Sequence, residues 1–424
     1  MLTINFIREN KDLIIERLKI KNFDAGNILD SVFEVDQRRR NIQKIQDSKQ
    51  AELNTISKEI GQLLKNGNIK EANAAKEKTS VLKEEIRKLN AELSEAQLSL
   101  NELLVQIPNI PHTSVPKGEG ANNNTVIRTG GNIPKFNLKA LAHWDLAKKY
   151  DIIDFELGNK ITGAGFPVYK GKGAKLQRAL INFFLDENEK AGYIEYLPPL
   201  VVNESSGFST GQLPDKEGLM YTIPSDNLYL IPTAEVPVTN IYRDVILNSK
   251  DLPVKNTAYT PCFRREAGSY GKDVRGLNRV HQFDKVEIVQ IQPSEKSYEA
   301  LEEMVTHVEN LVKQLELPYR IVKLCGGEMG FTSALTYDFE VFAAAQEKWL
   351  EVSSVSNFES YQATRLKLRI KDAGSKRTIF AHTLNGSALA LPRIVAALLE
   401  NNQTETGIGL PKVLLKYTGF DSIE

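Results

Sequence analysis

A long polar stretch near the N-terminus, residues 28–104, carries apolar side chains at helical spacing and contains no proline. In its second half these side chains recur at alternating steps of four and three residues, the heptad seam of a coiled coil, and its first half carries a weaker seam. The turn signal Lys65-Asn66-Gly67-Asn68 separates the two halves. We therefore predict two long helices joined by a short turn, an antiparallel coiled-coil hairpin that projects by about 45 to 50 Å. The seam residues are Ile42, Ile45, Leu53, Ile56, Ile60 and Leu63 in the first helix, and Leu82, Ile86, Leu89, Leu93, Ala96, Leu100 and Leu103 in the second.

The chain changes character after the hairpin. Residues 107–135 are rich in proline, glycine and asparagine, which predicts a linker. From residue 136 to 424, short β-like runs alternate with helical stretches, which predicts an α+β domain with a mainly antiparallel sheet. The expected parts are a helical domain at 1–106, with the hairpin at about 28–104, the linker at 107–135 and the α+β domain at 136–424. The predicted strands are 229–231, 258–264, 282–290, 319–324, 349–352 and 378–384, and the predicted helices are 175–190, 297–315 and 389–401.

Charge and composition exclude several classes of protein. Lysine plus arginine equals aspartate plus glutamate, 54 against 54, so any nucleic-acid contact must use a local patch. Charge appears too early in the chain for a signal peptide, and no apolar run reaches the roughly 18 residues of a membrane span. We therefore expect a cytoplasmic protein with no membrane partner. Five histidines and two isolated cysteines, Cys262 and Cys325, offer no disulfide framework and no obvious zinc site.

The charge of the hairpin leaves its role open. Residues 36–104 contain 13 lysines and arginines against 11 acidic residues, so the segment is close to neutral. A cluster at Arg38-Arg39-Arg40 and the lysines Lys76, Lys78 and Lys83 could contact phosphate, or could form an ordinary solvated face. On its pattern alone, the hairpin also suits a dimerisation or scaffold coil.

Polar residues gather in the second half of the chain, where no phosphate-binding loop or dinucleotide fingerprint stands. Phe263-Arg264-Arg265-Glu266 precedes a glycine-rich loop, residues 267–278, and His281 to Glu287 follows it. On strands, Arg264 and Glu266 would share one face, as would Phe283 and Glu287. A guanidinium suits phosphate and a ring suits base stacking, although a surface ion pair and a core phenylalanine explain the same residues.

Three further strings have the residue types of a ligand site. Thr233-Ala234-Glu235 and Glu351-Val352-Ser353-Ser354 combine a carboxylate with hydroxyls, a set that can hold Mg²⁺ beside phosphates. A run of small residues from Asn385 leads to Arg393 at the start of a predicted helix, where the helix dipole also favours anions. Each string alone is a weak signal.

Taken in order, these strings resemble the three motifs of class II aminoacyl-tRNA synthetases, and more narrowly the bacterial-type seryl-tRNA synthetases over nearly the whole chain. Residues 192–200, with Pro199 at the dimer-forming position, are similar to motif one. Residues 263–287 are similar to motif two and residues 385–393 to motif three. The Thr233–Glu235 triplet, the IPNIPH string at 107–112 and the long hairpin are similar to the seryl branch. The resemblance implies a class II antiparallel sheet flanked by helices, preceded by a helical domain with the coiled-coil arm.

The resemblance also implies a role for each residue that matches a motif. Arg264 would hold the α-phosphate of ATP, Glu266 and Phe283 the adenine, and Arg393 the γ-phosphate or the other adenine face. Glu351 and Ser354 would organise Mg²⁺. Arg393, Arg264 and Glu351 would be catalytic. The implied ATP-binding set is Arg264, Arg265, Glu266, Val280, Phe283, Glu351, Val352, Ser353, Ser354 and Arg393. The implied serine-binding set is Thr233, Ala234, Glu235, Arg264, Glu287, Asn385 and Ser387, with Glu287 on the ammonium group and Asn385 and Ser387 on the hydroxyl.

Two departures from the family pattern are small. Pro392 stands where many relatives have glycine, and Arg265 stands where serine is frequent, with its side chain expected to point away from the site.

The resemblance implies a homodimeric serine–tRNA ligase with ATP as substrate, Mg²⁺ as its cation and no zinc. L-serine would be activated to seryl-adenylate and moved to the 3′ end of tRNA(Ser), with tRNA(Sec) as a possible second substrate. Only residues 402–424 follow motif three, so RNA recognition would fall to the hairpin, which would bind the long variable arm of the tRNA.

Three alternatives remain. One is a ligase that charges a carrier protein, one is a non-catalytic coiled-coil adaptor, and one is a synthetase for another amino acid. The adaptor hypothesis predicts loss of Arg264, Glu266, Glu351 or Arg393, and all four are present.

Overall fold

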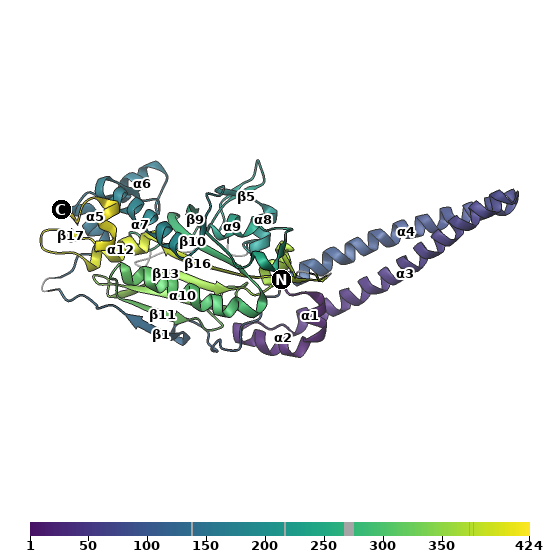
Figure 1. Cartoon of the computed structure of the whole chain (residues 1–424), viewed down its shortest axis with the longest axis horizontal. Helices are drawn as coiled ribbons and strands as arrows, with labels where there is room; N and C mark the ends of the chain where they lie inside the picture. Colours follow the sequence, from purple (N-terminus) through teal and green to yellow (C-terminus); the bar gives the residue numbers. More distant parts are fainter. Residues whose placement is uncertain (137–138, 216–217, 267–274, 373, 376) are drawn as a thin grey trace. The chain divides into compact units, whose positions relative to one another are not determined.

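Two long helices dominate the N-terminal part of the computed structural model (Figure 1). They are α3 (Gly26–Lys65) and α4 (Ile69–Leu104), and they pair through a turn at residues 66–68. The structure describes residues 1–136, 139–215, 218–266, 275–372, 374–375 and 377–424. By its contacts, the chain divides into one unit of Met1–Lys19 and Phe23–Pro108, and a second unit of Ile20–Asn22 and Asn109–Glu424.

The seam between α3 and α4 is apolar, as predicted. Leu53, Ile56, Leu82 and Ile86 form one buried cluster, because residues three and four apart face the same side of a helix. Ion pairs border the seam, from Lys49 to Glu85 at 2.7 Å and from Lys78 to Glu52 at 3.0 Å. Ile45 departs from the predicted seam, since 48% of its side chain is exposed. The antiparallel hairpin predicted from the heptads is confirmed, with its turn where the sequence indicated it.

Two short helices, α1 (Ile4–Glu9) and α2 (Lys11–Leu18), precede the hairpin, and α1 packs against α3. Asp36 on α3 is only 1% exposed and lies 2.9 Å from Arg39, 3.1 Å from Arg40 and 3.6 Å from Arg8. These cations compensate a buried carboxylate that would otherwise be costly. Arg39 and Arg40 thus belong to this cluster, whereas Arg38 is exposed and forms no ion pair with Asp36.

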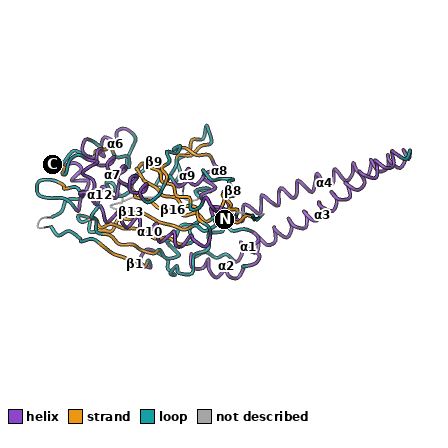
Figure 2. Tube along the Cα trace, viewed as in Figure 1, coloured by secondary structure: helices purple, strands orange, loops and turns teal. Residues whose placement is uncertain are grey.

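The second unit is built on an eight-stranded sheet with the strand order β1-β11-β12-β13-β16-β10-β9-β4. All neighbours pair antiparallel except β4 and β9, which are parallel. The strands are β1 (Thr125–Gly130), β4 (Ile194–Glu195), β9 (Val254–Phe263), β10 (Gln282–Gln292), β11 (Tyr319–Lys323), β12 (Leu335–Ala343), β13 (Lys348–Asn357) and β16 (His382–Ala390). This α+β architecture confirms the fold class predicted from the sequence (Figure 2).

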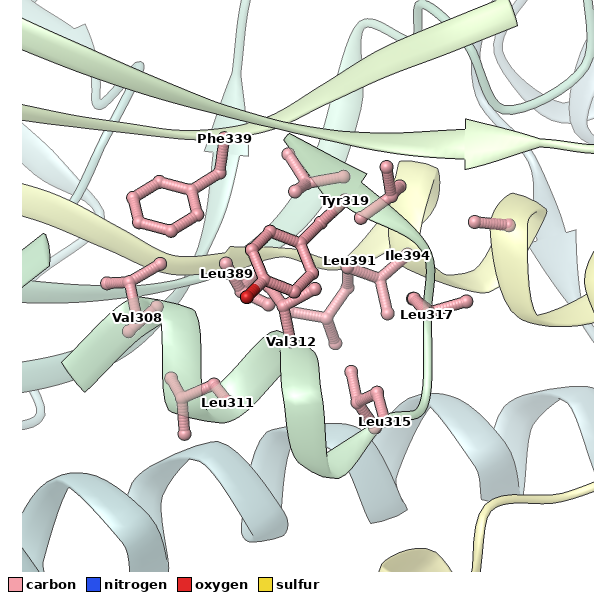
Figure 3. Packing of buried hydrophobic residues seen from close by; sticks show 14 of the residues in the cluster. Val308, Leu311, Val312, Leu315, Leu317, Tyr319, Phe339, Leu389, Leu391 and Ile394 are labelled. Carbon is pink, nitrogen blue, oxygen red and sulfur yellow. The ribbon is translucent and has the colours of Figure 1, made fainter. Parts of the chain in front are cut away.

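One face of the sheet forms the core, and its partners are α7 (Gly171–Lys190), α10 (Ser297–Gln314) and α12 (Leu391–Asn401). Figure 3 shows Val308, Leu311 and Val312 of α10 beside Phe339 of the sheet. Burying a leucine or phenylalanine side chain contributes about 1.5–3 kcal/mol. Because side chains alternate along a strand, Val286 and Ile288 of β10 enter this core, and their odd-numbered neighbours face the opposite side.

Smaller elements surround the sheet. The helices are α5 (His143–Lys149), α6 (Phe155–Ile161), α8 (Glu204–Thr210), α9 (Glu235–Asn240), α11 (Tyr361–Leu366) and α13 (Leu415–Thr418). The short strands are β2 (Ile153–Asp154), β3 (Val168–Tyr169), β5 (Val201–Asn203), β6 (Thr222–Ile223), β7 (Leu228–Leu230), β8 (Ile246–Asn248), β14 (Arg369–Lys371), β15 (Thr378–Phe380), β17 (Ile408–Gly409) and β18 (Ser422–Ile423). In the described part of the chain, no helix is both long and apolar enough to cross a membrane.

The structure differs from the sequence-based elements in several places. The predicted strand 378–384 is two strands, since residues 378–380 form β15 of a three-stranded sheet and the chain enters the eight-stranded sheet at His382 as β16. Residues 125–130, expected to belong to the linker, form β1 at the edge of the sheet, where they pair with β11. Strand β12 was not predicted, although Tyr337, Phe339 and Val341 alternate with polar residues along it. Residues 389–390 were expected to begin a helix, but they end β16, because the chain remains paired to β10 up to Ala390.

Candidate active site

A cavity of about 540 Å³ opens on the face of the sheet opposite the face that packs against α10. Strands β10, β12, β13 and β16 line part of it, and loop segments and the first turn of α12 line the rest. The structure brings nearly all of the predicted site residues together here. Those that line the cavity are Thr233, Glu235, Arg264, Glu266, Val280, Phe283, Glu287, Glu351, Val352, Ser353, Ser354, Asn385, Ser387 and Arg393.

Two residues of the predicted sets do not line this cavity. Ala234 is fully buried and packs against Val238, Ala258 and Val289, behind the wall. Arg265 is exposed, and its backbone N–H donates to the carbonyl of Leu219. Neither side chain lines the cavity, which for Arg265 is the orientation expected from the sequence.

The first wall of the cavity holds Arg264 and Phe283. The guanidinium carbon of Arg264 lies 5.4 Å from the centroid of the Phe283 ring, and its Nε donates to the carbonyl of Pro232 at 3.3 Å. Strand β9 ends at Phe263, so Arg264 and Glu266 do not share a strand face as the sequence suggested. Both nevertheless line the cavity, and Glu266, at a φ of +46°, pairs with Arg279. Residues 267–274 of the predicted loop lie outside the described residues.

Arg393 bridges two parts of the opposite wall. Its Nε donates to the carbonyl of Asn278 at 3.0 Å, and its Nη1 donates to the carbonyl of Glu351 at 2.7 Å. The residue stands in the first turn of α12, just after Pro392, which occupies a helix position that needs no backbone N–H. Arg264 and Arg393 therefore offer two guanidinium groups to one cavity, a pair suited to a polyphosphate.

An acidic corner lies between β12 and β13. Ser354 Oγ donates to Asp338 Oδ1 at 2.5 Å, and Glu351 stands on the same strand as Ser354. Burial, and then the charge of Glu351, raises the pKa of Asp338 well above its ordinary value. Sequence analysis missed Asp338, although a charged residue at the cavity-facing position of an alternating strand was a usable signal. A divalent cation fits this corner only if a ligand adds oxygens, because the described residues hold no cluster of three His, Cys, Asp or Glu side chains.

The innermost wall carries two carboxylates and a lysine. Thr233 Oγ1 donates to Glu287 Oε2 at 3.0 Å, and Lys285 forms an ion pair with the same carboxylate. The Glu235 carboxylate accepts from Gln362 Nε2 at 2.6 Å. Burial, and then the charge of Glu287, raises the pKa of Glu235 to about 7.

Two of these residues, Lys285 and Gln362, were missed from the sequence. Lys285 stands two residues before Glu287 on one strand, and this spacing was a signal that could have found it. Gln362 comes from α11, and no local pattern relates it to the site.

Asn385 and Ser387 of β16 lie beside this wall. The Asn385 side chain is near Glu235, but its Nδ2 is buried and makes no hydrogen bond of good geometry with any described residue. Ser387 accepts through its backbone carbonyl from Ser353 Oγ at 2.6 Å. A buried amide donor without a partner costs free energy, and a ligand oxygen would remove that cost. The cavity therefore joins a cationic region, an acidic corner and a polar pocket with two carboxylates.

Comparison with known proteins places this cavity in context. Residues 1–111 match the family described as "Seryl-tRNA synthetase N-terminal domain", and residues 221–402 match "tRNA synthetase class II core domain (G, H, P, S and T)". The chain is 50% identical to a serine–tRNA ligase of Salinibacter ruber, over 100% of this chain and 99% of that protein. It is 45% identical to the serine–tRNA ligase of Carboxydothermus hydrogenoformans over the same shares. Among solved structures, seryl-tRNA synthetase from Pyrococcus horikoshii complexed with ATP superimposes with a TM-score of 0.92 at 34% identity, over 100% of this chain and 99% of that one.

Proposed function

The chain belongs to the seryl-tRNA synthetase family, and on this premise we propose that it activates L-serine with ATP and joins the serine to a serine tRNA. It is an ATP-dependent serine–tRNA ligase of class II. The observation that carries the proposal is the single cavity that holds Arg264 and Arg393 at one region and the Glu235 and Glu287 carboxylates at another. Such a cavity suits a polyphosphate and an ammonium group at the same time.

In the first step, the serine carboxylate attacks the α-phosphorus of ATP. A bond forms between a carboxylate oxygen and phosphorus, the bond to the bridging oxygen breaks, and pyrophosphate leaves. No protein nucleophile is needed, so the protein contributes positioning and charge neutralisation. Arg264 and Arg393 stabilise the negative charge of the phosphates. Asp338, Glu351 and Ser354 would hold Mg²⁺, which supplies further neutralisation of the phosphate oxygens.

Serine binding uses the innermost wall. We propose that the carboxylates of Glu287 and Glu235 bind the serine ammonium group. Thr233 and Lys285 hold Glu287 in place, and Gln362 holds Glu235. The buried Nδ2 of Asn385, which lacks a hydrogen bond of good geometry among the described residues, then donates to the serine hydroxyl, with Ser387 beside it. A site that hydrogen-bonds a hydroxyl rejects alanine and glycine strongly, because those ligands leave its buried groups unpaired.

In the second step, the terminal hydroxyl of the tRNA attacks the carbonyl carbon of seryl-adenylate, and AMP leaves. We propose that the α3–α4 hairpin binds the tRNA, with selenocysteine tRNA as a second substrate. Arg38, Lys76 and Lys83 are exposed on the hairpin and are available to phosphate. We propose that this reaction takes place in the cytoplasm.

We also propose a homodimer formed along residues 192–200. Strand β4 ends the sheet, so one side of it is unpaired in the part of the chain that the structure describes. Ile194 is 63% exposed and Leu197 is 86% exposed, and both stand near Pro199. A second copy of this surface would bury those side chains and cover the strand edge.

The test of this function is aminoacylation with purified components. The chain, ATP, Mg²⁺, labelled serine and a serine tRNA transcript should yield acid-precipitable label that alkaline treatment releases. A charged carrier protein in place of charged tRNA would favour the carrier-ligase alternative, and no product in either case would favour the adaptor. A selenocysteine tRNA transcript tested in parallel decides the second substrate.

A further inference from the structure

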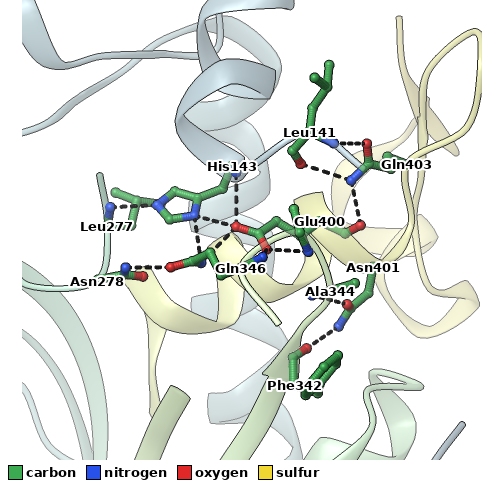
Figure 4. Close-up of polar contacts among 11 residues, drawn as sticks. Leu141, His143, Leu277, Asn278, Phe342, Ala344, Gln346, Glu400, Asn401 and Gln403 are labelled. Carbon is green, nitrogen blue, oxygen red and sulfur yellow. Dashed lines mark hydrogen bonds and ion pairs between the residues drawn. The ribbon is translucent and has the colours of Figure 1, made fainter. Parts of the chain in front are cut away.

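A fully buried histidine–carboxylate pair lies outside the cavity (Figure 4). His143 Nδ1 is 2.7 Å from Glu400 Oε1, and both side chains are 0% exposed. His143 begins α5, and Glu400 lies in the last turn of α12. The mechanism above uses neither residue, and neither lines the cavity. A buried carboxylate is costly unless donors surround it, so this pair has to be explained.

Glu400 is surrounded by donors from two other segments. Its Oε1 also accepts from the backbone N–H of His143 at 3.0 Å and from Gln346 Nε2 at 2.8 Å. Its Oε2 accepts from the backbone N–H groups of Ala345 at 3.0 Å and Gln346 at 3.3 Å. Glu400 therefore ties the turn between β12 and β13 to the start of α5.

The tautomer of His143 follows from its second nitrogen. The backbone N–H of Leu277 donates to His143 Nε2 at 2.9 Å, so Nε2 carries no hydrogen. Nδ1 then carries the ring hydrogen and donates it to Glu400, whereas the contact of Nδ1 with Gln346 Nε2 is longer, at 3.4 Å. Glu400 thus fixes the imidazole in the one form that accepts from Leu277.

Leu277 lies near the end of the glycine-rich loop inside motif two, and residues 275–278 fit closely against α5. Gly276 has a φ of +68°, and a Cβ there would lie 2.3 Å from His143 Nε2, so only glycine allows this approach. The Arg275 guanidinium carbon lies 4.6 Å from the Trp144 ring centroid. Residues 275–278 therefore pack directly against the start of helix α5.

Residues 275–278 connect the start of α5 with the part of the cavity that we propose binds ATP. Leu277 and Asn278 line the cavity, and the carbonyl of Asn278 accepts from Arg393 Nε. Asn278 Nδ2 donates to Gln346 Oε1 at 2.7 Å, and Gln346 Nε2 donates to Glu400. His143, Leu277, Asn278, Gln346 and Glu400 therefore form one closed circuit of hydrogen bonds and a peptide bond. Asn278 Oδ1 is buried in the wall and has no hydrogen-bond partner among the described residues. Displacement of Leu277 would thus move both a wall of the cavity and the carbonyl that orients Arg393.

We infer that His143 and Glu400 are positioning residues for ATP: they hold residues 275–278 inside motif two, and through Asn278 also Arg393, in the geometry that binds the nucleotide. Neither residue touches a substrate in this account. The inference rests on the proposed function, because it deepens the role of the same cavity. The serine pocket lies on Thr233, Glu287 and Asn385, outside this circuit, so its affinity should not depend on the pair.

The experiment compares two replacements of His143 that each keep one hydrogen bond. His143→Gln can keep an acceptor for Leu277, whereas His143→Asn can keep a donor for Glu400 but cannot reach Leu277. KM for ATP in serine-dependent pyrophosphate exchange should stay within about threefold for His143→Gln and rise by about tenfold or more for His143→Asn. KM for serine should change by less than about twofold in both variants. His307→Gln is the matched control, since His307 is a half-buried histidine that bonds Asn188 and takes no part in this circuit.

Two further measurements keep the inference falsifiable. Gln346→Leu cuts the link from Glu400 to Asn278 without opening a large void, and should raise KM for ATP with KM for serine unchanged. The calorimetric Kd for ATP with Mg²⁺, measured without serine, should follow the same order as KM.

Equal ATP affinities for His143→Asn and His143→Gln would overturn the inference, as would parallel rises in both KM values that follow a loss of Tm. Absence of exchange in the unaltered chain would instead contradict the proposed function, while the ATP Kd series would still test the positioning role.

Discussion

Glu235 and Glu287 share the innermost wall of the cavity, and the charge of Glu287 adds to burial in raising the pKa of Glu235 to about 7. If both carboxylates bind the serine ammonium group, Glu235 must be ionised for full affinity. Because its pKa is raised, the ionised form is lost as the pH falls through about 7. We predict that kcat/KM for serine falls by about tenfold per pH unit below that point.

The measurement is pyrophosphate exchange between pH 5.5 and 8.5, with serine varied at saturating ATP. KM for ATP, varied at saturating serine, is the internal control and should be much less sensitive to pH. A value of kcat/KM for serine that stays level from pH 8 to pH 5.5 would remove Glu235 from ammonium binding.

The same raised pKa predicts a stability effect. A carboxyl whose pKa is higher in the folded chain than in the unfolded chain contributes stability below its unfolded pKa, and loses it as the pH rises through about 7. At pH 8 the ionised Glu235 therefore destabilises the fold. We predict that Glu235→Gln raises the free energy of unfolding at pH 8 by up to roughly 3 kcal/mol, and has little effect near pH 4.5.

Denaturant unfolding of both chains at the two pH values measures this difference, and exchange assays should show that the stabilised variant no longer uses serine efficiently. A variant that is less stable than the unaltered chain at pH 8 would show that the hydrogen bond from Gln362 outweighs the cost of the buried charge.

The acidic corner predicts a change in the Mg²⁺ requirement. Glu351→Gln removes a carboxylate from the corner shared with Asp338 and Ser354, so a higher Mg²⁺ concentration should be needed for half-maximal exchange, by about tenfold. The matched control is Glu347→Gln, an exposed glutamate in the turn of the same hairpin of strands, which should leave the Mg²⁺ titration unchanged. Identical titrations for both variants would exclude Glu351 from cation binding.

The hairpin predicts a separation of the two chemical steps. Lys49 and Glu85 face each other across the seam, so the segment between them can be replaced by a short glycine turn without breaking the remaining pairing. This shortened chain should retain pyrophosphate exchange within about twofold and lose tRNA aminoacylation by about a hundredfold or more. An equal loss of pyrophosphate exchange and of tRNA aminoacylation would mean that the hairpin stabilises the cavity in addition to binding the tRNA.

Periodic patterns in the sequence predicted the parts of the fold that local chemistry determines. The heptads gave the α3–α4 seam, because each seam residue contributes to the same helix face. Strand β12 was missed despite its alternation, and β1 was assigned to the linker because a short edge strand gains its structure by pairing with β11, far away in sequence.

Sequence analysis found some residues of the site and missed others, and the difference has a physical reason. Residues in contiguous strings, such as Glu351 to Ser354, were found together, and all line the cavity. Gln362 was missed because its relation to the site depends on helix packing, whereas Asp338 and Lys285 were missed although the alternation of side chains along their strands was a usable signal. The pairing of His143 with Glu400 joins residues 257 positions apart, and no local pattern carries that information.

Serine-dependent exchange of pyrophosphate into ATP, measured without tRNA for serine, threonine, alanine, glycine and cysteine, tests the central claim most directly. The account predicts strong exchange with serine and values lower by about a hundredfold or more for alanine and glycine, which leave Asn385 unpaired. Threonine should be rejected less strongly, because the lack of room for one methyl group is worth only about 1–3 kcal/mol. Strong exchange with a different amino acid, or none with any of the five in folded protein with Mg²⁺, would contradict the assignment of this cavity to serine activation.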